Sequence, residues 1–122
     1  MIDIKDVSVT YQGQKGLTEA LKGVDLKINK GDFVVLLGPS GCGKSTLLNL
    51  IAGYNKPITG EVLMHGEAIK GPDKNRGVVF QSTNLYPWLS VKENIEYGLK
   101  IRKVDKKTRD DLTRLFLEEI NL

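Results

Sequence analysis

The chain has few of the residues that mark secreted, disulfide-stabilised or membrane-spanning proteins. It holds one cysteine among 122 residues, so no internal disulfide can form, which fits a reducing compartment. No stretch approaches the roughly 18 consecutive apolar residues of a membrane span. The opening residues, Met1–Asp6, place acids and alternation where a signal peptide needs basic residues and an apolar run. We therefore expect a soluble, uncleaved, intracellular protein.

An excess of charge of one sign is also lacking. Lys and Arg number 18 against 15 Asp and Glu, a net charge of +3, and the basic residues look scattered along the chain. This charge is too small to indicate a nucleic-acid partner. The hydrophobic share of 40% is enough for the core of about one domain. Glycine, in contrast, is abundant, with 13 residues in 122 against an average of about 7%.

Apolar residues alternate with polar ones in two N-terminal stretches. Ile2 to Tyr11 and Val24–Ile28 therefore predict two antiparallel strands of a half-exposed sheet. Asn29–Asp32 has the composition of a tight turn. The five apolar residues Phe33–Leu37 do not alternate, which is typical of a strand covered on both faces.

The rest of the chain predicts helices with short strands between them. Leu47–Ile51 carries a helical apolar stripe, and Gly53 is placed to end that helix. Glu61–Met64 predicts a short strand that leaves through a turn at His65 and Gly66. Further along, the pattern predicts an apolar strand at Val78–Phe80, a helix opening with a capping box at Ser90 and Glu93, and a helix capped by Asp105 with Leu112, Leu115, Phe116 and Glu119 on one face.

A glycine-rich motif lies between the Phe33–Leu37 run and the helix predicted after it. Gly38, Gly43, Lys44 and Ser45 match the Walker A pattern, Gly-x-x-x-x-Gly-Lys-Ser, in full. Glycines let backbone N–H groups turn inward as donors to phosphate oxygens, and the following helix adds the positive end of its dipole. In this motif the lysine reaches the β- and γ-phosphates and the serine hydroxyl binds Mg²⁺. Its place between strand and helix predicts a nucleotide-binding loop.

Two other nucleotide-binding patterns fit less well. A dinucleotide fingerprint built on Gly41 and Gly43 would need a third glycine where Thr46 stands. Asn29–Asp32 matches the guanine-specificity pattern Asn-Lys-x-Asp, but it precedes the phosphate loop and fits an ordinary turn. Neither pattern displaces the phosphate-loop interpretation.

Together with this loop, Tyr11, Gln81 and the phrase from Val79 to Val91 resemble the ATP-binding subunit of ABC transporters. The phrase Pro87-Trp88, followed by Ser90, Val91, Asn94 and Ile95, is most similar to the nitrate, sulfonate and taurine branch of bacterial importers. The resemblance begins at Met1 and covers only the first half of such a subunit. It implies an α/β P-loop NTPase core with an antiparallel β subdomain at the N-terminus.

The resemblance also implies a site for ATP and Mg²⁺. Tyr11 would stack on adenine, and the Gln81 amide would complete the Mg²⁺ shell or orient water. Lys44 and Gln81 would be catalytic, and Ser45 and Gln81 would bind the metal. The residues expected to contact the nucleotide are Tyr11, Gly38, Pro39, Ser40, Gly41, Cys42, Gly43, Lys44, Ser45 and Thr46. A packing role for Tyr11 and a strand-ending role for Gln81 stay open as alternatives.

Several later motifs of the family are not found in the 122 residues: the signature loop, the Walker B strand, the D-loop and the switch histidine. Leu115–Glu119 imitates Walker B, but its helical spacing favours an amphipathic helix. His65 lies too early to be the switch histidine. We therefore interpret the chain as the N-terminal part of an importer ATPase, truncated before the Walker B half. In such a truncated chain the strands predicted at Phe33–Leu37 and Val78–Phe80 would lack their sheet neighbours. We therefore expect the chain to be weakly stable or to associate with other copies.

The implied organisation has four parts. Residues 1–32 would form the antiparallel β region, 33–53 the Walker A strand, loop and helix, 54–81 a β region up to Gln81, and 82–122 the start of a helical subdomain. In the family two ATP-binding subunits form a dimer, and membrane permease subunits would contact Ser82–Ser90. Trp88 in that segment is equally suited to a core position.

The implied function is ATP binding, and hydrolysis in the full-length dimer, that drives import of a small anion such as a sulfonate, taurine or nitrate. The subunit would be cytoplasmic, peripheral on the inner face of the membrane through the permease. Whether this chain is itself an enzyme stays open, because hydrolysis needs a general base normally supplied after Walker B. A nucleotide-binding module without turnover and a P-loop protein unrelated to transport are the alternatives.

Overall fold

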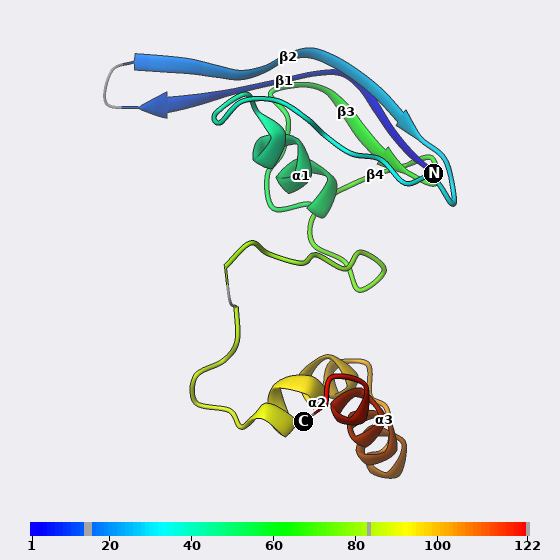
Figure 1. Ribbon diagram of the computed structural model, residues 1–122. Coiled ribbons are helices and arrows are strands. Elements are labelled where there is room, and N and C mark those ends of the chain that lie inside the picture. The colour runs from blue at the N-terminus through cyan, green and yellow to red at the C-terminus, as the bar shows by residue number, and fades with distance from the viewer. Residues whose placement is uncertain (14–15, 83, 122) are drawn as a thin grey trace. The chain divides into compact units, whose positions relative to one another are not determined.

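The computed structural model describes residues 1–13, 16–82 and 84–121. The chain divides into two units, Met1–Val78 and Val79–Leu122. The elements in chain order are β1 (Ile2–Gly13), β2 (Gly16–Ile28), α1 (Lys44–Ala52), β3 (Thr59–Met64), β4 (Glu67–Ala68), α2 (Val91–Ile101) and α3 (Lys106–Glu119) (Figure 1). Over the described ranges, no helix is both long enough and apolar enough to cross a membrane. The four-part division stays a prediction.

The first unit is built on an antiparallel sheet in the order β2-β1-β3-β4. β1 lies in its interior, with Ile4 opposite Leu26 on one side and Val62 on the other. The predicted antiparallel pair is therefore confirmed, but both strands are longer than their alternating stretches. Pairing continues to Gly13 opposite Gly16, because backbone hydrogen bonds extend the hairpin beyond the part whose side chains are buried.

An irregularity in β1 keeps its apolar side chains on the core side. The pairing register shifts between Ile4 and Val7, and Asp6 adopts a left-handed φ of 46°. The Asp6 backbone N–H donates to Asp25 Oδ1 at 2.9 Å, which holds this bulge in place. An extra residue in a strand reverses the side-chain alternation that follows. Ile4 and Val7, which are an odd number of residues apart, are therefore both buried.

Helix α1 covers one face of this sheet (Figure 1). Leu47 and Leu50 on the helix pack with sheet residues in one buried cluster, whose members are Ile4, Val7, Val9, Leu21, Leu47, Leu50 and Val62. The helix ends as predicted at Gly53, which has a left-handed φ of 84°. The core therefore lies between α1 and the sheet, and it holds α1 against the strands.

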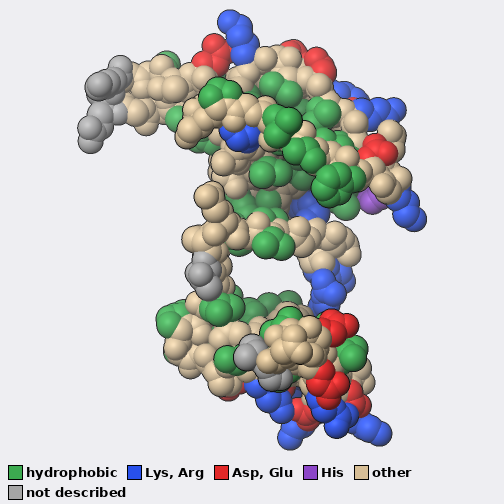
Figure 2. Space-filling view, viewed as in Figure 1, with side chains coloured by type: hydrophobic (Ala, Val, Ile, Leu, Met, Phe, Trp, Pro, Cys, Tyr) green, Lys and Arg blue, Asp and Glu red, His purple; other side chains and the backbone are tan. Residues whose placement is uncertain are grey.

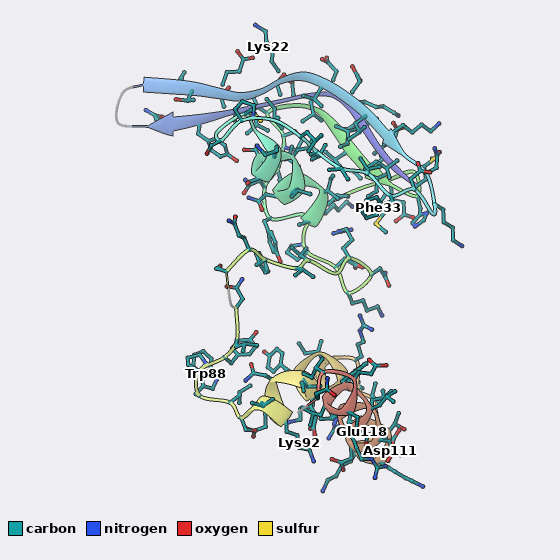
Figure 3. The ribbon with its side chains drawn as sticks, viewed as in Figure 1. Lys22, Phe33, Trp88, Lys92, Asp111 and Glu118 are labelled. Carbon is teal, nitrogen blue, oxygen red and sulfur yellow. The ribbon has the colours of Figure 1, made fainter. Side chains whose placement is uncertain are left out.

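The strands predicted at Phe33–Leu37 and Val78–Phe80 are wrong for this structure. Neither run forms a strand, and Phe33 and Leu37 are 93% and 89% exposed. A run becomes a strand only through a hydrogen-bonded neighbour, and none of the strands described pairs with these residues. Figure 3 shows Phe33 on the extended segment before α1. The side chains of both runs are exposed instead, except that of Leu36, which is half-buried and packs against the core.

The second unit consists of α2 and α3 with the segment that leads into α2. The capping box is confirmed: Glu93 N–H donates to Ser90 Oγ at 3.3 Å and Ser90 N–H to Glu93 Oε2 at 2.8 Å. The bonds from Ser90 lower the pKa of Glu93. Asp105 caps α3 as predicted, accepting from Thr108 N–H at 3.0 Å. Hydrogen bonding from the Thr108 side chain, and then from its backbone N–H, lowers the pKa of Asp105.

The apolar face predicted for α3 is only partly buried. Leu115 and Phe116 are exposed and Leu112 is half-buried, whereas Thr113 is buried. Charged side chains take part in the packing of the two helices: Glu96 on α2, whose side chain is 8% exposed, lies 3.8 Å from Arg109 Nε on α3. Lys92 and Lys100 approach the same carboxylate at 3.6 and 3.4 Å. The Arg109–Glu96 pair therefore joins α3 to α2, and the two lysines add to it from within α2.

Candidate phosphate-binding site

The Walker A loop lies between the Phe33–Leu37 run and α1, and its shape requires glycine. Gly41 and Gly43 adopt left-handed φ values of 80° and 93°. A Cβ on Gly43 would lie 2.5 Å from the Ala20 carbonyl oxygen and 2.8 Å from Leu21 Cδ2. The loop is therefore pressed directly against β2, and no larger residue fits at its last turn.

The start of α1 is open to an anion. Gly43 precedes the helix, and α1 has neither a side-chain cap nor an acidic residue in its first turn among the residues described. The first amides of a helix have no partner within the helix, and they carry the positive end of the dipole. This helix end is therefore chemically suited to phosphate oxygens.

Lys44 turns back over the loop instead of extending into solvent. Its Nζ donates to the carbonyl oxygens of Gly38 and Pro39 at 2.8 and 2.6 Å, and to Cys42 Sγ at 3.4 Å. Cys42 N–H in turn donates to the Pro39 carbonyl at 3.4 Å, closing a turn within the loop. The ammonium is thereby held within the loop, next to the amides that would face a phosphate.

The remaining loop residues line the same turn. Ser40, Cys42 and Ser45 are exposed, and Thr46 is half-buried at the first turn of α1. The structure therefore brings the predicted residues from Gly38 to Thr46 together in one accessible loop, although their roles toward a nucleotide stay predictions.

Tyr11 lies on β1, the strand that pairs with β2, and the loop contacts β2. It comes two residues after Val9, which pairs with Leu21, the residue that contacts the Gly43 position. The Tyr11 ring is exposed, and its hydroxyl accepts a hydrogen bond from Asn55 Nδ2 at 2.8 Å. Sequence reasoning missed Asn55, because 44 residues separate the pair and only the return of the chain after α1 brings them together.

Gln81 belongs to the second unit, three residues after the unit boundary, and its side chain is exposed. The Walker A loop belongs to the first unit. The structure therefore describes the two separately, and the metal-binding and catalytic roles of Gln81 stay predictions.

An aromatic cluster lies in the predicted permease-contacting segment. The ring centroid of Tyr86 is 5.4 Å from that of Trp88 and 4.5 Å from that of Tyr97 on α2. Hydrogen bonding with Tyr97 raises the pKa of Tyr86. Trp88 is 75% exposed, so within the described residues it is a surface side chain rather than a core one (Figure 3).

One side chain on α2 organises the backbone of this segment. Asn94 Nδ2 donates to the carbonyl oxygens of Tyr86, Leu89 and Ser90 at 3.2, 3.1 and 3.0 Å. Asn94 Oδ1 accepts from Tyr86 N–H at 2.9 Å. This role was not predicted; the sequence singled out Asn94 only as part of the phrase that resembles the importer branch. The amide fixes the turn that presents Trp88.

Several curated relatives are similar to this chain along most of its length. The nitrate import ATP-binding protein of Synechocystis sp. is 40% identical over 121 residues, 99% of this chain and 46% of the relative. The taurine import ATP-binding protein of Burkholderia pseudomallei is 43% identical over 118 residues, 97% of this chain and 45% of the relative. The aliphatic sulfonates import ATP-binding protein of Bacillus cereus is 43% identical over 109 residues, which are 89% of this chain and 43% of the relative. The chain spans a little under half the length of these relatives.

A solved structure agrees with this similarity. The ATP-binding cassette MJ0796, in a dimeric post-hydrolysis state bound to ADP and Pi, has a TM-score of 0.86 and 36% identity. The similarity covers all of this chain and 58% of that one. The family model for ABC transporters matches residues 21–121. The phosphate loop, the fold and these matches agree, and the chain belongs to the ABC transporter family.

Proposed function

We propose that this chain is the nucleotide-binding part of an ABC importer subunit that uses MgATP to drive uptake of a small anion such as nitrate, taurine or an aliphatic sulfonate. The observation that carries the proposal is the glycine loop at the uncapped start of α1, with Lys44 folded over it. The transport reaction and the substrate class are those named for the three import relatives.

The loop fits a triphosphate in its donor chemistry. Backbone amides from Gly41 to Lys44 would donate to phosphate oxygens, and Lys44 would exchange its carbonyl partners for the β- and γ-phosphates. The hydroxyls of Ser45 and Thr46 stand at the first turn of α1, where the first would bind Mg²⁺. Most ligands of a nucleotide-bound Mg²⁺ are water molecules and phosphate oxygens, so a single hydroxyl from this loop would be enough to attach the ion to the protein.

Two residues outside the loop would complete the nucleotide site. Tyr11, held by Asn55 at its hydroxyl, would offer its exposed ring to adenine. Gln81 would join the Mg²⁺ shell or orient the attacking water. When bound, the metal neutralises charge that develops on the phosphates during transfer.

The assembly would match that of other transporter subunits. A second ATP-binding subunit would complete a dimer, as in the dimeric cassette MJ0796. The Tyr86–Trp88 cluster, fixed by Asn94, would receive a short helix of the membrane permease through its exposed aromatic surface. The subunit would thereby lie on the cytoplasmic face of the membrane without entering it.

Calorimetric titration with MgATP tests the nucleotide site. Lys44→Ala should weaken MgATP binding about 10- to 100-fold, because the charge-assisted hydrogen bonds from the ammonium to the phosphates are lost. Lys70→Ala, which removes an exposed lysine of the same unit, serves as the matched control and should bind like the parent chain. Equal affinities for the parent and Lys44→Ala would overturn the proposed site.

A further inference from the structure

The basic residues of the chain are not evenly scattered, contrary to the expectation from composition. Six of the ten residues from Lys100 to Arg109 are Lys or Arg, and Asp105 is the only acid among them. These ten residues span the end of α2, the connection and the start of α3. We name them the basic corner. Figure 2 shows blue Lys and Arg side chains, with acidic ones among them, over this helical unit.

Some charges of the basic corner are already used within the fold. Lys100 and Arg109 both approach the buried carboxylate of Glu96, at 3.4 and 3.8 Å. The Asp105 carboxylate accepts the Thr108 N–H as the cap of α3. Lys103, Lys106 and Lys107 are exposed, and none of the three is within ion-pair distance of an acidic group among the described residues. Lys106 is close enough to Asp110 to help Lys92 lower the pKa of that carboxyl. Three cations therefore point into solvent from one short stretch.

Each of these three lysines occupies a position that disfavours it locally. Lys103 follows α2 with a left-handed φ of 58°, a conformation that costs a residue with a side chain and that glycine usually takes. Lys106 and Lys107 are the first two residues of α3, where the positive end of the helix dipole repels cations. Clustered departures from local preference point to selection for something other than stability.

We propose that the basic corner binds the anionic phospholipid headgroups of a membrane surface. Lysine clusters on the cytoplasmic side are attracted to such surfaces without fixed geometry, whereas defined phosphate recognition favours arginine forks. Ile101 is exposed beside the lysines and offers an apolar contact to the headgroup boundary. The ten residues contain no aromatic side chain to stack on nucleic-acid bases. The choice of a membrane rests on the proposed transporter function.

Flotation with lipid vesicles tests the proposal. The full chain should bind vesicles containing about 30% phosphatidylglycerol in phosphatidylcholine, and should not bind pure phosphatidylcholine. Binding should fall as the salt concentration rises, because added salt shortens the Debye length and screens the lysines from the headgroups. The variant Lys103→Gly, Lys106→Gln, Lys107→Gln should lose on the order of 100-fold in partitioning, from about fivefold per charge. The glycine also relieves the left-handed strain, so this variant should fold at least as stably as the parent.

A matched variant separates local binding from net charge. Lys22→Gln, Lys27→Gln, Lys30→Gln removes the same charge from exposed sites of the first unit, where Lys22 projects from the sheet away from α1 (Figure 3). This control should keep parental vesicle binding. Equal losses in both variants, no binding to anionic vesicles, or preferred binding to polyglutamate or single-stranded DNA would overturn the proposal. MgATP titration of the same variants distinguishes the two proposals, since nucleotide affinity should not change with the basic corner.

Discussion

At the scale of single residues, the phosphate loop depends on positions where the backbone and its neighbours leave no choice. Lys44 is held by three atoms of its own loop, so it is positioned before any ligand arrives. Gly43 lies against the backbone of Ala20, which couples the loop to β2. The motif could be recognised from the sequence, but this contact could not, because it depends on how the hairpin folds over α1.

The two left-handed glycines of the loop provide a prediction with an internal control. Gly43→Ala should lower the free energy of unfolding by about 2–4 kcal/mol, from left-handed strain plus the clash with Ala20. Gly41→Ala shares the strain but meets no atom within 4 Å, so it should cost only about 1–2 kcal/mol. Urea titrations followed by circular dichroism measure both. Equal costs would show that the contact with β2 does not constrain the loop.

Cys42 gives a second prediction at this scale. Its thiol is exposed, it is the only cysteine of the chain, and its Sγ accepts from Lys44 Nζ at 3.4 Å. We expect N-ethylmaleimide to modify this one site and to block ATP binding, because the adduct would fill the loop. MgATP should slow modification in the parent chain but not in Lys44→Ala. Identical rates with and without MgATP would contradict this account.

At the scale of elements, α2 and α3 are held by charge to an unusual degree. The Glu96 carboxylate is buried and surrounded by Lys92, Lys100 and Arg109. Lys92 also reaches Asp110 at 2.5 Å, and this bond raises the pKa of Lys92 while it lowers that of Asp110. Removing one partner of a buried ion pair leaves the others without compensation. Glu96 should therefore matter more than any surface pair of the same helices.

Glu96→Gln tests this view of the helix pair. We expect it to lower the free energy of unfolding by about 1–3 kcal/mol, less than for a fully buried pair because the lysines are partly solvated. Asp111→Asn removes an exposed pair with Arg114 on α3 and should cost at most about 0.5 kcal/mol. The fluorescence of Trp88, the single tryptophan, reports on this unit during urea titration. Similar costs for the two variants would refute the special role of Glu96.

At the scale of the whole molecule, local signals were predictable and tertiary ones were not. The caps at Ser90 and Asp105 and the end of α1 at Gly53 follow from hydrogen bonds within a few residues, and all three are confirmed. The strand at Phe33–Leu37 failed because a strand depends on a distant neighbour. Leu115 and Phe116 are exposed although they share the apolar face predicted for α3, because helical periodicity does not show which neighbours will cover a face.

The exposed apolar runs lead to a prediction for the molecule as a whole. Phe33 and Leu37 are almost fully exposed, and Figure 2 shows hydrophobic side chains gathered on the surface of the first unit. Burying such area stabilises association by about 25 cal/mol per Å², so the chain should self-associate as its concentration rises. Phe33→Ser with Leu37→Ser should shift sedimentation velocity profiles toward monomer. Leu17→Ser, at an exposed site 76% accessible on the β1–β2 hairpin, should not. A parent chain that stays monomeric and melts in one sharp transition would mean that these runs find cover within a single copy.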